Sequence, residues 1–182
     1  LRRGPFLGDH TAHLDVAADG SLLVYGTLTR DLDLGTGALA GADPDLAYVA
    51  LDAAGNVLAS RRFVAPGVQQ AEHIRRLADT SVMISGTSDV DLDLGAGVLP
   101  GGTRWVAHLD ASGVALSSWA LPPAAFSALA DLSFDDAGAV LTATGGGPTT
   151  LEKRDVSGQL MWTHDYPVRV RAELAPTGGA AL

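Results

Sequence analysis

The chain has 182 residues, a formal net charge of −9 and no cysteine. The lack of cysteine excludes disulfides, thiolate metal sites and a cysteine nucleophile, and the acidic balance argues against nucleic acid as a partner because phosphate backbones are also negative. Hydrophobic residues make up 47% of the sequence, which predicts a folded core. No apolar run of about 18 residues occurs, so we expect no transmembrane segment.

In chain order, the sequence predicts short strands separated by turns rich in Gly and Asp. Residues 1–6 resemble an outer strand, comparable with Ser60–Phe63. Four further strands are then expected, at Thr11–Ala17, Ser21–Thr27, Leu46–Leu51 and Val57–Phe63. The next segment, Gln69–Leu77, has the composition of one short helical turn.

Internal repetition is the strongest feature of the sequence. Gly26-Thr27 precedes the segment DLDLG at residues 31–35, and Gly86-Thr87 precedes the same segment at residues 91–95, 60 positions later. The offset falls to 58 at Gly55 and Gly113, which indicates a two-residue deletion in the intervening loop. A third copy, at 140–158, lacks the DLDLG segment, and a fourth begins near Val168.

A four-stranded unit that recurs at this spacing is typical of a β-propeller blade. We therefore expect an all-β chain of about three consecutive four-stranded antiparallel blades, forming one arc over residues 1–182. The predicted blades span approximately 10–66, 70–121 and 124–166, with partial blade strands at 1–6 and 168–182. Three blades cannot close a ring, so missing blades or another chain would complete it. The alternatives are a β-sandwich of duplicated hairpins and a β-solenoid, whose coils usually repeat at half this length or less.

Two segments carry a resemblance to a known family. The stretches Ala47–Phe63 (AYVALDAAGNVLASRRF) and Ala17–Thr27 (AADGSLLVYGT) resemble the bacterial β-propeller repeat family of the seven-bladed type, and the DLDLG loop is similar to the insertion between its two motifs. The fourth-strand tryptophan of that family is kept only as Trp162. The resemblance implies a propeller fold and a secreted, periplasmic or cell-surface bacterial protein, including a lipoprotein. It implies no catalytic residue, because the motif is architectural.

The DLDLG loops are candidate calcium ligands. Asp31 and Asp33 lie two residues apart, so on an extended chain both carboxylates point to one side while the leucines point to the other. Asp91 and Asp93 repeat this arrangement. A calcium site needs six or more oxygen ligands, and no further acidic ligands follow in the pattern. We predict a solvated edge with inward leucines and no bound metal or other cofactor, with calcium at these four carboxylates as the weaker alternative.

A second candidate site involves the first strand of each repeat. His13 and His73 occupy the same repeat position, and their counterparts are near Asp131 and Arg171. In a propeller these strands line the central channel, so the four side chains could converge on an anion, a metal or a small molecule. The alternative is an ordinary solvated channel with no ligand.

The sequence offers no catalytic motif. It contains no Gly-x-Ser-x-Gly elbow, and Gly145-Gly146-Gly147 lacks the Lys-Ser/Thr of a phosphate loop, which makes it a turn. The leading hypothesis is a non-catalytic propeller repeat module for protein or polysaccharide binding or for surface scaffolding. The alternative is a sugar-active propeller enzyme, a hydrolase or lyase with a central-channel site. The irregular third copy differs by a deletion and not by an added insert, which favours binding.

Overall fold

The computed structural model describes residues 12–33, 38–40, 44–122, 129–145, 148–170, 173–174 and 180–181. Within these ranges the chain forms strands and connections without any helix, so the predicted all-β class is confirmed. Accordingly, no helix in the described ranges is long and apolar enough to cross a membrane. Gln69–Leu77, whose composition allows one short helical turn, forms a strand over Gln69–Arg76 instead.

Three antiparallel sheets of four strands follow one another along the chain, each with its strands in sequence order. The first sheet contains β1 (Ala12–Val16), β2 (Leu22–Leu28), β5 (Asp45–Leu51) and β6 (Val57–Phe63). The second contains β7 (Gln69–Arg76), β8 (Val82–Ser88), β11 (Thr103–Leu109) and β12 (Ala115–Ala120). The third contains β13 (Leu129–Phe134), β14 (Val140–Thr144), β15 (Thr149–Arg154) and β16 (Leu160–Tyr166).

Three two-stranded hairpins complete the described structure. Two of them lie between the second and third strands of the first and second sheets, at the DLDLG segments. These hairpins are β3 (Leu32–Asp33) with β4 (Ala38–Leu39), and β9 (Leu92–Asp93) with β10 (Val98–Leu99). The third hairpin begins a fourth sheet and consists of β17 (Glu173–Leu174) and β18 (Ala180–Ala181).

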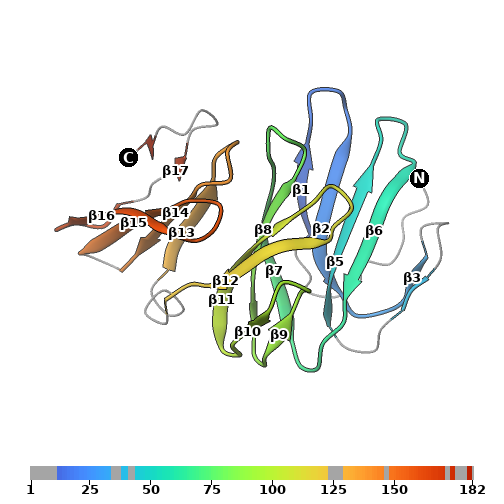
Figure 1. Ribbon diagram of the computed structural model, residues 1–182, viewed down its shortest axis with the longest axis horizontal. Coiled ribbons are helices and arrows are strands. Elements are labelled where there is room, and N and C mark those ends of the chain that lie inside the picture. The colour runs from blue at the N-terminus through green and yellow to red at the C-terminus, as the bar shows by residue number, and fades with distance from the viewer. Residues whose placement is uncertain are drawn as a thin grey trace.

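The sheets stack side by side with their first strands adjacent (Figure 1). The first strand of the second sheet, β7, contacts both β1 and β13, and β13 in turn contacts β17. Figure 1 shows the first sheet at the right of the molecule and the third at the left, with the second between them. The repeats of the sequence therefore appear as repeated sheets whose first strands form one continuous row.

The strand register confirms that the repeat positions are structurally equivalent. His13 pairs with Tyr25 in the first sheet, and His73 pairs with Ser85 in the second. Asp131 pairs with Ala143 in the third sheet. A β-bulge lies immediately before His73 and before Asp131, where the pairing with the second strand shifts by one residue. The three side chains thus start from corresponding points of three neighbouring strands.

The largest core lies between the first and second sheets. Tyr25, Tyr48 and Trp105 are fully buried there. Trp105 packs directly on Gly86, where an added Cβ would lie 2.4 Å from the Gln70 carbonyl oxygen and 2.7 Å from the indole ring. The glycine of the repeated Gly-Thr pair is therefore required by close packing in the second sheet.

The threonine of the first Gly-Thr pair joins two sheets. The Thr27 hydroxyl donates to the carbonyl oxygen of Gln69 at 3.2 Å and accepts from the amide of Ala71 at 3.3 Å. Both partners belong to β7, so a buried side chain from β2 satisfies backbone groups of the neighbouring sheet. This contact fixes the position of the first strand that carries His73.

The sequence predicts that nine apolar strand residues are mostly buried, and the structure separates them into two groups. Six are buried: Val49, Val82, Ile84, Val106, Leu109 and Leu141. The other three, Leu22, Val24 and Leu51, are only half-buried. All three lie on the face of the first sheet that points away from the second sheet, together with the buried Val49. In the described part of the chain, no other four-stranded sheet packs on this face.

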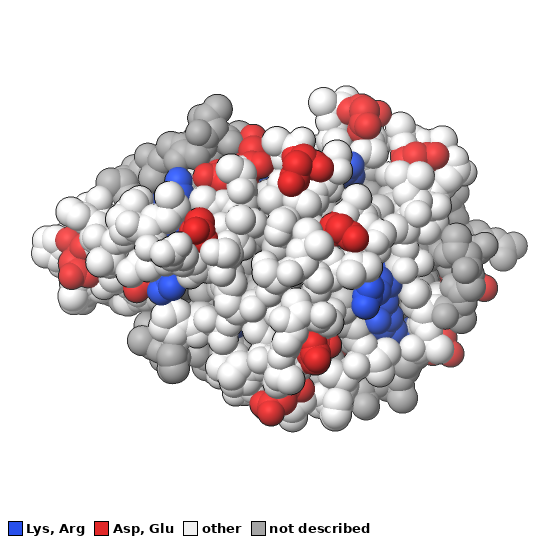
Figure 2. All heavy atoms as spheres, viewed as in Figure 1, with Lys and Arg blue, Asp and Glu red and all other residues white. Residues whose placement is uncertain are grey.

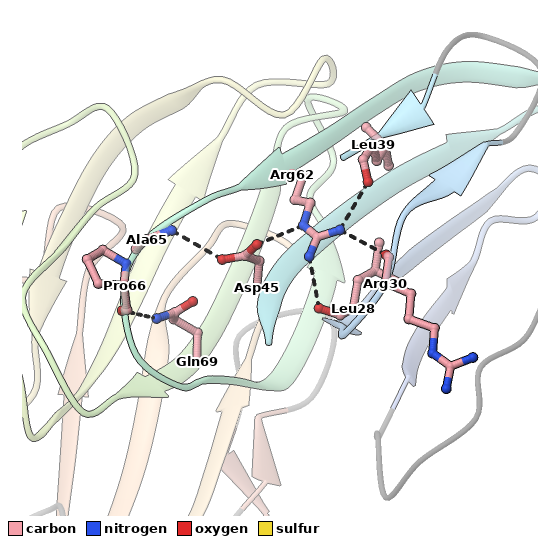
Figure 3. A network of polar contacts seen from close by, with 8 residues as sticks. All are labelled: Leu28, Arg30, Leu39, Asp45, Arg62, Ala65, Pro66 and Gln69. Atoms are coloured by element: carbon pink, nitrogen blue, oxygen red, sulfur yellow. Dashed lines mark hydrogen bonds and ion pairs between the residues drawn. The ribbon is translucent and has the colours of Figure 1, made fainter. Parts of the chain in front are cut away.

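A buried ion pair fastens the β3–β4 hairpin to the first sheet (Figure 3). Arg62 Nε lies 2.8 Å from Asp45 Oδ2, and the two side chains are 3% and 0% exposed. The same guanidinium donates to the carbonyl oxygens of Arg30 and Leu39, at 2.9 and 3.0 Å, and to that of Leu28 at 3.3 Å. One arginine on β6 thereby holds both ends of the inserted hairpin.

Candidate functional site

The structure brings His13 and His73 together on the row of first strands. The two imidazole rings stack with their centroids 6.1 Å apart and their planes inclined by 29°. His13 Nε2 lies 3.2 Å from the carbonyl oxygen of Ala71, and His73 Nδ1 lies 3.0 Å from Ser85 Oγ. Both rings are half-buried, so the contact sits between the first and second sheets and remains partly open to solvent.

Asp131 extends this pair toward the third sheet. Its negative charge is close enough to His73 to influence the pKa of that imidazole. Its Oδ1 accepts a hydrogen bond from the amide of Leu132 at 3.0 Å. Phe134, from the same strand, meets the His73 ring edge-on, with centroids 6.5 Å apart. The fourth predicted member, Arg171, lies outside the described residues.

The electrostatic surroundings favour the neutral form of His73. Its burial lowers the pKa of the imidazole, because a charged ring would lose solvation, and the nearby His13 and Arg104 act in the same direction. The carboxylates of Glu72 and Asp131 oppose the shift without reversing it. A neutral imidazole keeps one donor and one acceptor, so His73 can both give and receive a hydrogen bond.

An ion pair that the sequence pattern does not indicate lies beside these histidines. Glu72 Oε1 lies 2.9 Å from both Nε and Nη2 of Arg104, joining β7 to β11 within the second sheet. The pair is mostly buried, with side-chain exposures of 23% for Arg104 and 19% for Glu72. Glu72 stands next to His73 in the sequence, but only the strand register reveals that Arg104 is its partner.

The second DLDLG segment forms a hairpin with a solvated acidic edge, as predicted. Leu92 and Leu94 are buried in the core between the first two sheets, at 0% and 1% exposure. Asp91 and Asp93 are exposed on the opposite side. The alternation expected from an extended chain is therefore confirmed for this copy. In the first copy, residues 34–37 lie outside the described part of the chain.

The carboxylates of the second hairpin bind its own backbone. Asp93 Oδ1 accepts hydrogen bonds from the amides of Gly95 and Gly97, at 2.7 and 3.3 Å. Asp91 Oδ1 accepts one from the amide of Gly101 at 2.9 Å. These contacts give the repeated acids a structural role in closing the hairpin.

The acidic residues of the DLDLG segments are not joined by further metal-ligating side chains in the described part of the chain. Among the described residues, no three His, Asp or Glu side chains are grouped so that they could hold a metal ion. This includes Asp31 and Asp33 as well as their counterparts in the second hairpin. The prediction that the DLDLG loops bind no calcium, with calcium at the four carboxylates as the weaker alternative, is tested by a calcium titration of the melting temperature.

The Asp-x-x-Gly turns use their carboxylates in the same structural way. Asp52 Oδ1 accepts from the amides of Ala54 and Asn56, at 2.9 and 2.8 Å, and the side-chain hydrogen bond from Asn56 is the main cause of its lowered pKa. Equivalent contacts lower the pKa of Asp110 and Asp155. In two turns of a different sequence, hydrogen bonds from Ser21 and Ser81 lower the pKa of Asp19 and Asp79. The aspartates of these turns are therefore occupied within the turns themselves.

On the face drawn in Figure 2, acidic side chains are dispersed over several parts of the molecule and outnumber the basic ones. This distribution matches the net charge of −9. The His13–His73 pair with Asp131 is distinguished by the convergence of equivalent repeat positions.

Comparison with known proteins supports the fold. No protein-family model matches the chain, and no curated protein matches it. Among solved structures, a protein of unknown function from Bacteroides caccae is similar, with a TM-score of 0.54 and 11% sequence identity. The similarity covers 97% of this chain and 54% of that one, so the chain spans about half the length of that structure. At this identity the likeness concerns the fold alone.

Proposed function

We propose that the three stacked sheets are consecutive blades of a β-propeller and that the chain is a non-catalytic module that binds polysaccharide. The row of adjacent first strands supports this reading, because a propeller places the first strand of every blade around a central axis. The observation that carries the proposal is the stacking of His13 on His73 from equivalent positions of two sheets, with Asp131 at the same register in the third.

The chemistry of this cluster favours a ligand rich in neutral hydroxyl groups. Burial keeps His73 neutral, so it offers a donor and an acceptor, which suits a sugar hydroxyl better than an anionic group. His13 uses Nε2 and His73 uses Nδ1 for contacts within the protein, so the opposite nitrogen of each ring would meet the ligand. Asp131 would accept a further hydroxyl, as a carboxylate does.

Binding is favoured over sugar cleavage by the form of the repeats. The first two sheets carry the same inserted hairpin, and the third sheet differs from them by lacking it and not by an added loop that could carry catalytic residues. The location proposed with this function, secreted or on the bacterial surface, rests on the family resemblance.

Titration calorimetry with a panel of neutral oligosaccharides tests the proposal. The chain should bind at least one of them, and the double variant His13→Ala/His73→Ala should weaken that binding by about tenfold or more, which is about 1.4 kcal/mol. His164→Ala, on the outer strand β16, is the matched control and should bind as the original chain does. Binding that survives the double substitution would contradict this site, and release of shorter sugars would indicate an enzyme instead.

A further inference from the structure

One face of the first sheet is apolar, and within the described ranges of the chain no other four-stranded sheet packs on it. We call it the open face and define it by Leu14, Leu22, Val24, Leu51 and Val57, which line a groove of about 720 Å³. Leu14 is 60% exposed, and Leu22, Val24, Leu51 and Val57 are half-buried. Exposed apolar surface that is contiguous over a whole sheet face marks an interaction site.

The residues of the open face have counterparts at equivalent positions of the second sheet. The pairs Leu14–Val24 and Leu22–Leu51 of the open face occupy the same strand positions as Ile74–Ile84 and Val82–Leu109 of the second sheet. Val57 likewise corresponds to Ala115.

In the second sheet these counterparts are covered. Val82, Ile84 and Leu109 are each 0% exposed, because they pack against the inner face of the first sheet, and Ile74 and Ala115 border the same core. The same apolar pattern is therefore buried in one sheet and open in its neighbour. The open face therefore has the strand register and the apolar composition of a face that packs against another four-stranded sheet.

We propose that a second copy of this chain covers the open face. The far end of the stack offers the matching partner, because the described chain already begins a further sheet there. Leu174 of β17 packs against Leu141, Ala143 and Leu151 of the third sheet. A second copy placed head to tail would continue this stacking, with its C-terminal end against the open face of the first copy.

The area of the open face argues for two such contacts. Four strands spaced about 4.8 Å apart and seven residues long cover roughly 400 Å². A stable interface buries about 800 Å² per partner, so one contact of this size would be weak. Two copies closed head to tail use both ends of each stack and reach the required area.

Light scattering after size exclusion measures the association directly. The chain should have the mass of two copies, and Val24→Asp or Leu51→Asp should reduce it to one copy by placing a charge in the buried contact. Leu116→Asp is the matched control, because Leu116 is 56% exposed on β12 and lies outside the open face. A single-copy mass for the original chain throughout a dilution series would overturn the proposal, and so would a folded Val24→Asp variant that still forms dimers.

A spin label provides a second measurement that does not depend on how the charged variants fold. The chain has no cysteine, so Leu14→Cys and Leu116→Cys each introduce one unique thiol at similar exposure. The label at position 14 should be immobilised and should become mobile on dilution, while the label at 116 stays mobile. A mobile label at 14 in a concentrated sample would refute docking at this face. Neither measurement involves sugar, so docking and polysaccharide binding can fail separately.

Discussion

The hydroxyl of Tyr48 in the first sheet donates a hydrogen bond to the backbone carbonyl oxygen of Ala111 in the second, at 3.0 Å. Tyr48→Phe keeps the aromatic ring in the core and removes this one donor. We expect a loss of about 1 kcal/mol in the free energy of unfolding, since a partly buried hydrogen bond between the two sheets is removed. Urea denaturation measures it, and Tyr166→Phe, at the other end of the stack, is the control. An unchanged unfolding free energy would show that this hydrogen bond does not help to join the sheets.

The same tyrosine predicts a loss of stability at alkaline pH. Burial raises the pKa of Tyr48 to about 12 from an ordinary value of 10.0, because the phenolate is poorly solvated. The protonated form is favoured in the folded state, so this contribution is present below pH 10 and is lost as pH rises from 10 toward 12. Denaturation midpoints measured over this range should fall, and should fall less in Tyr48→Phe. The buried Tyr25, whose pKa is also raised, should leave part of the slope in that variant.

Thr80 carries backbone strain that glycine would relieve. Its φ is 72°, while its repeat counterpart Gly20 has φ 83°, a region that β-branched residues strongly disfavour. Thr80→Gly should stabilise the protein by about 1 kcal/mol, because relief of strain outweighs the greater freedom of glycine in the unfolded chain. Thermal denaturation checks this, with Gly20→Thr as the reciprocal variant that should destabilise. If Thr80→Gly lowers the melting temperature, the strain is compensated elsewhere.

The buried pair Arg62–Asp45 should tolerate joint replacement better than single replacement. Arg62→Met leaves an unpaired carboxylate at 0% exposure and is expected to cost about 3–5 kcal/mol. The double variant Arg62→Met/Asp45→Leu removes both charges and should recover much of that loss. It should not recover all of it, because the carbonyl oxygens of Leu28 and Leu39 lose their donor. A double-mutant cycle by urea denaturation measures the coupling, and strictly additive effects would argue against the pair as drawn in Figure 3.

The turn aspartates predict sensitivity to acid. Hydrogen bonds within the turns lower the pKa of Asp52, Asp110 and Asp155 below the ordinary 3.8. Their ionised form is favoured on folding, so the stabilisation is full above pH 3.8 and is lost as pH falls through the lower folded pKa values. Asp110→Asn should reduce the acid dependence of the denaturation midpoint. The control is Asp136→Asn. The carboxylate of Asp136 pairs with Arg75, whereas the hydrogen bonds from the turn amides go to its neighbour Asp135.

The sequence predicted the strands well where local pattern and tertiary environment agree. The strand expected at Val57–Phe63 is β6 with the same bounds, because turn residues delimit it on the N-terminal side and an apolar residue closes it. The composition of Gln69–Leu77 allows one short helical turn, because Gln, Ala, Glu and Arg favour helices locally. Its pairing with β8 and its contacts with Thr27 override that preference.

Repetition identified equivalent positions but not their surroundings. An offset of 60 residues was enough to place His13 and His73 at the same point of neighbouring strands, and their stacking follows from the adjacency of those strands. The Glu72–Arg104 pair needed the register of β7, β8 and β11, including a bulge that sequence does not reveal. The partial exposure of Leu22 and Val24 could not be predicted either. An apolar strand has the same sequence pattern whether its sheet lies at the end of the stack or between two other sheets.

The inserted hairpins show where this chain tolerates change in length. The β3–β4 and β9–β10 hairpins each form a sheet of their own, while the pairing of β2 with β5 and of β8 with β11 continues undisturbed. The third sheet has the same four-strand order with only a short connection, 145–148, at that junction. For protein engineering, the junction is therefore a ready position for grafting a foreign peptide. The tip at 95–97, where Gly95 and Gly97 are exposed and Ala96 is half-buried, is the first place to display such a peptide, since the leucines that anchor the hairpin would stay unchanged.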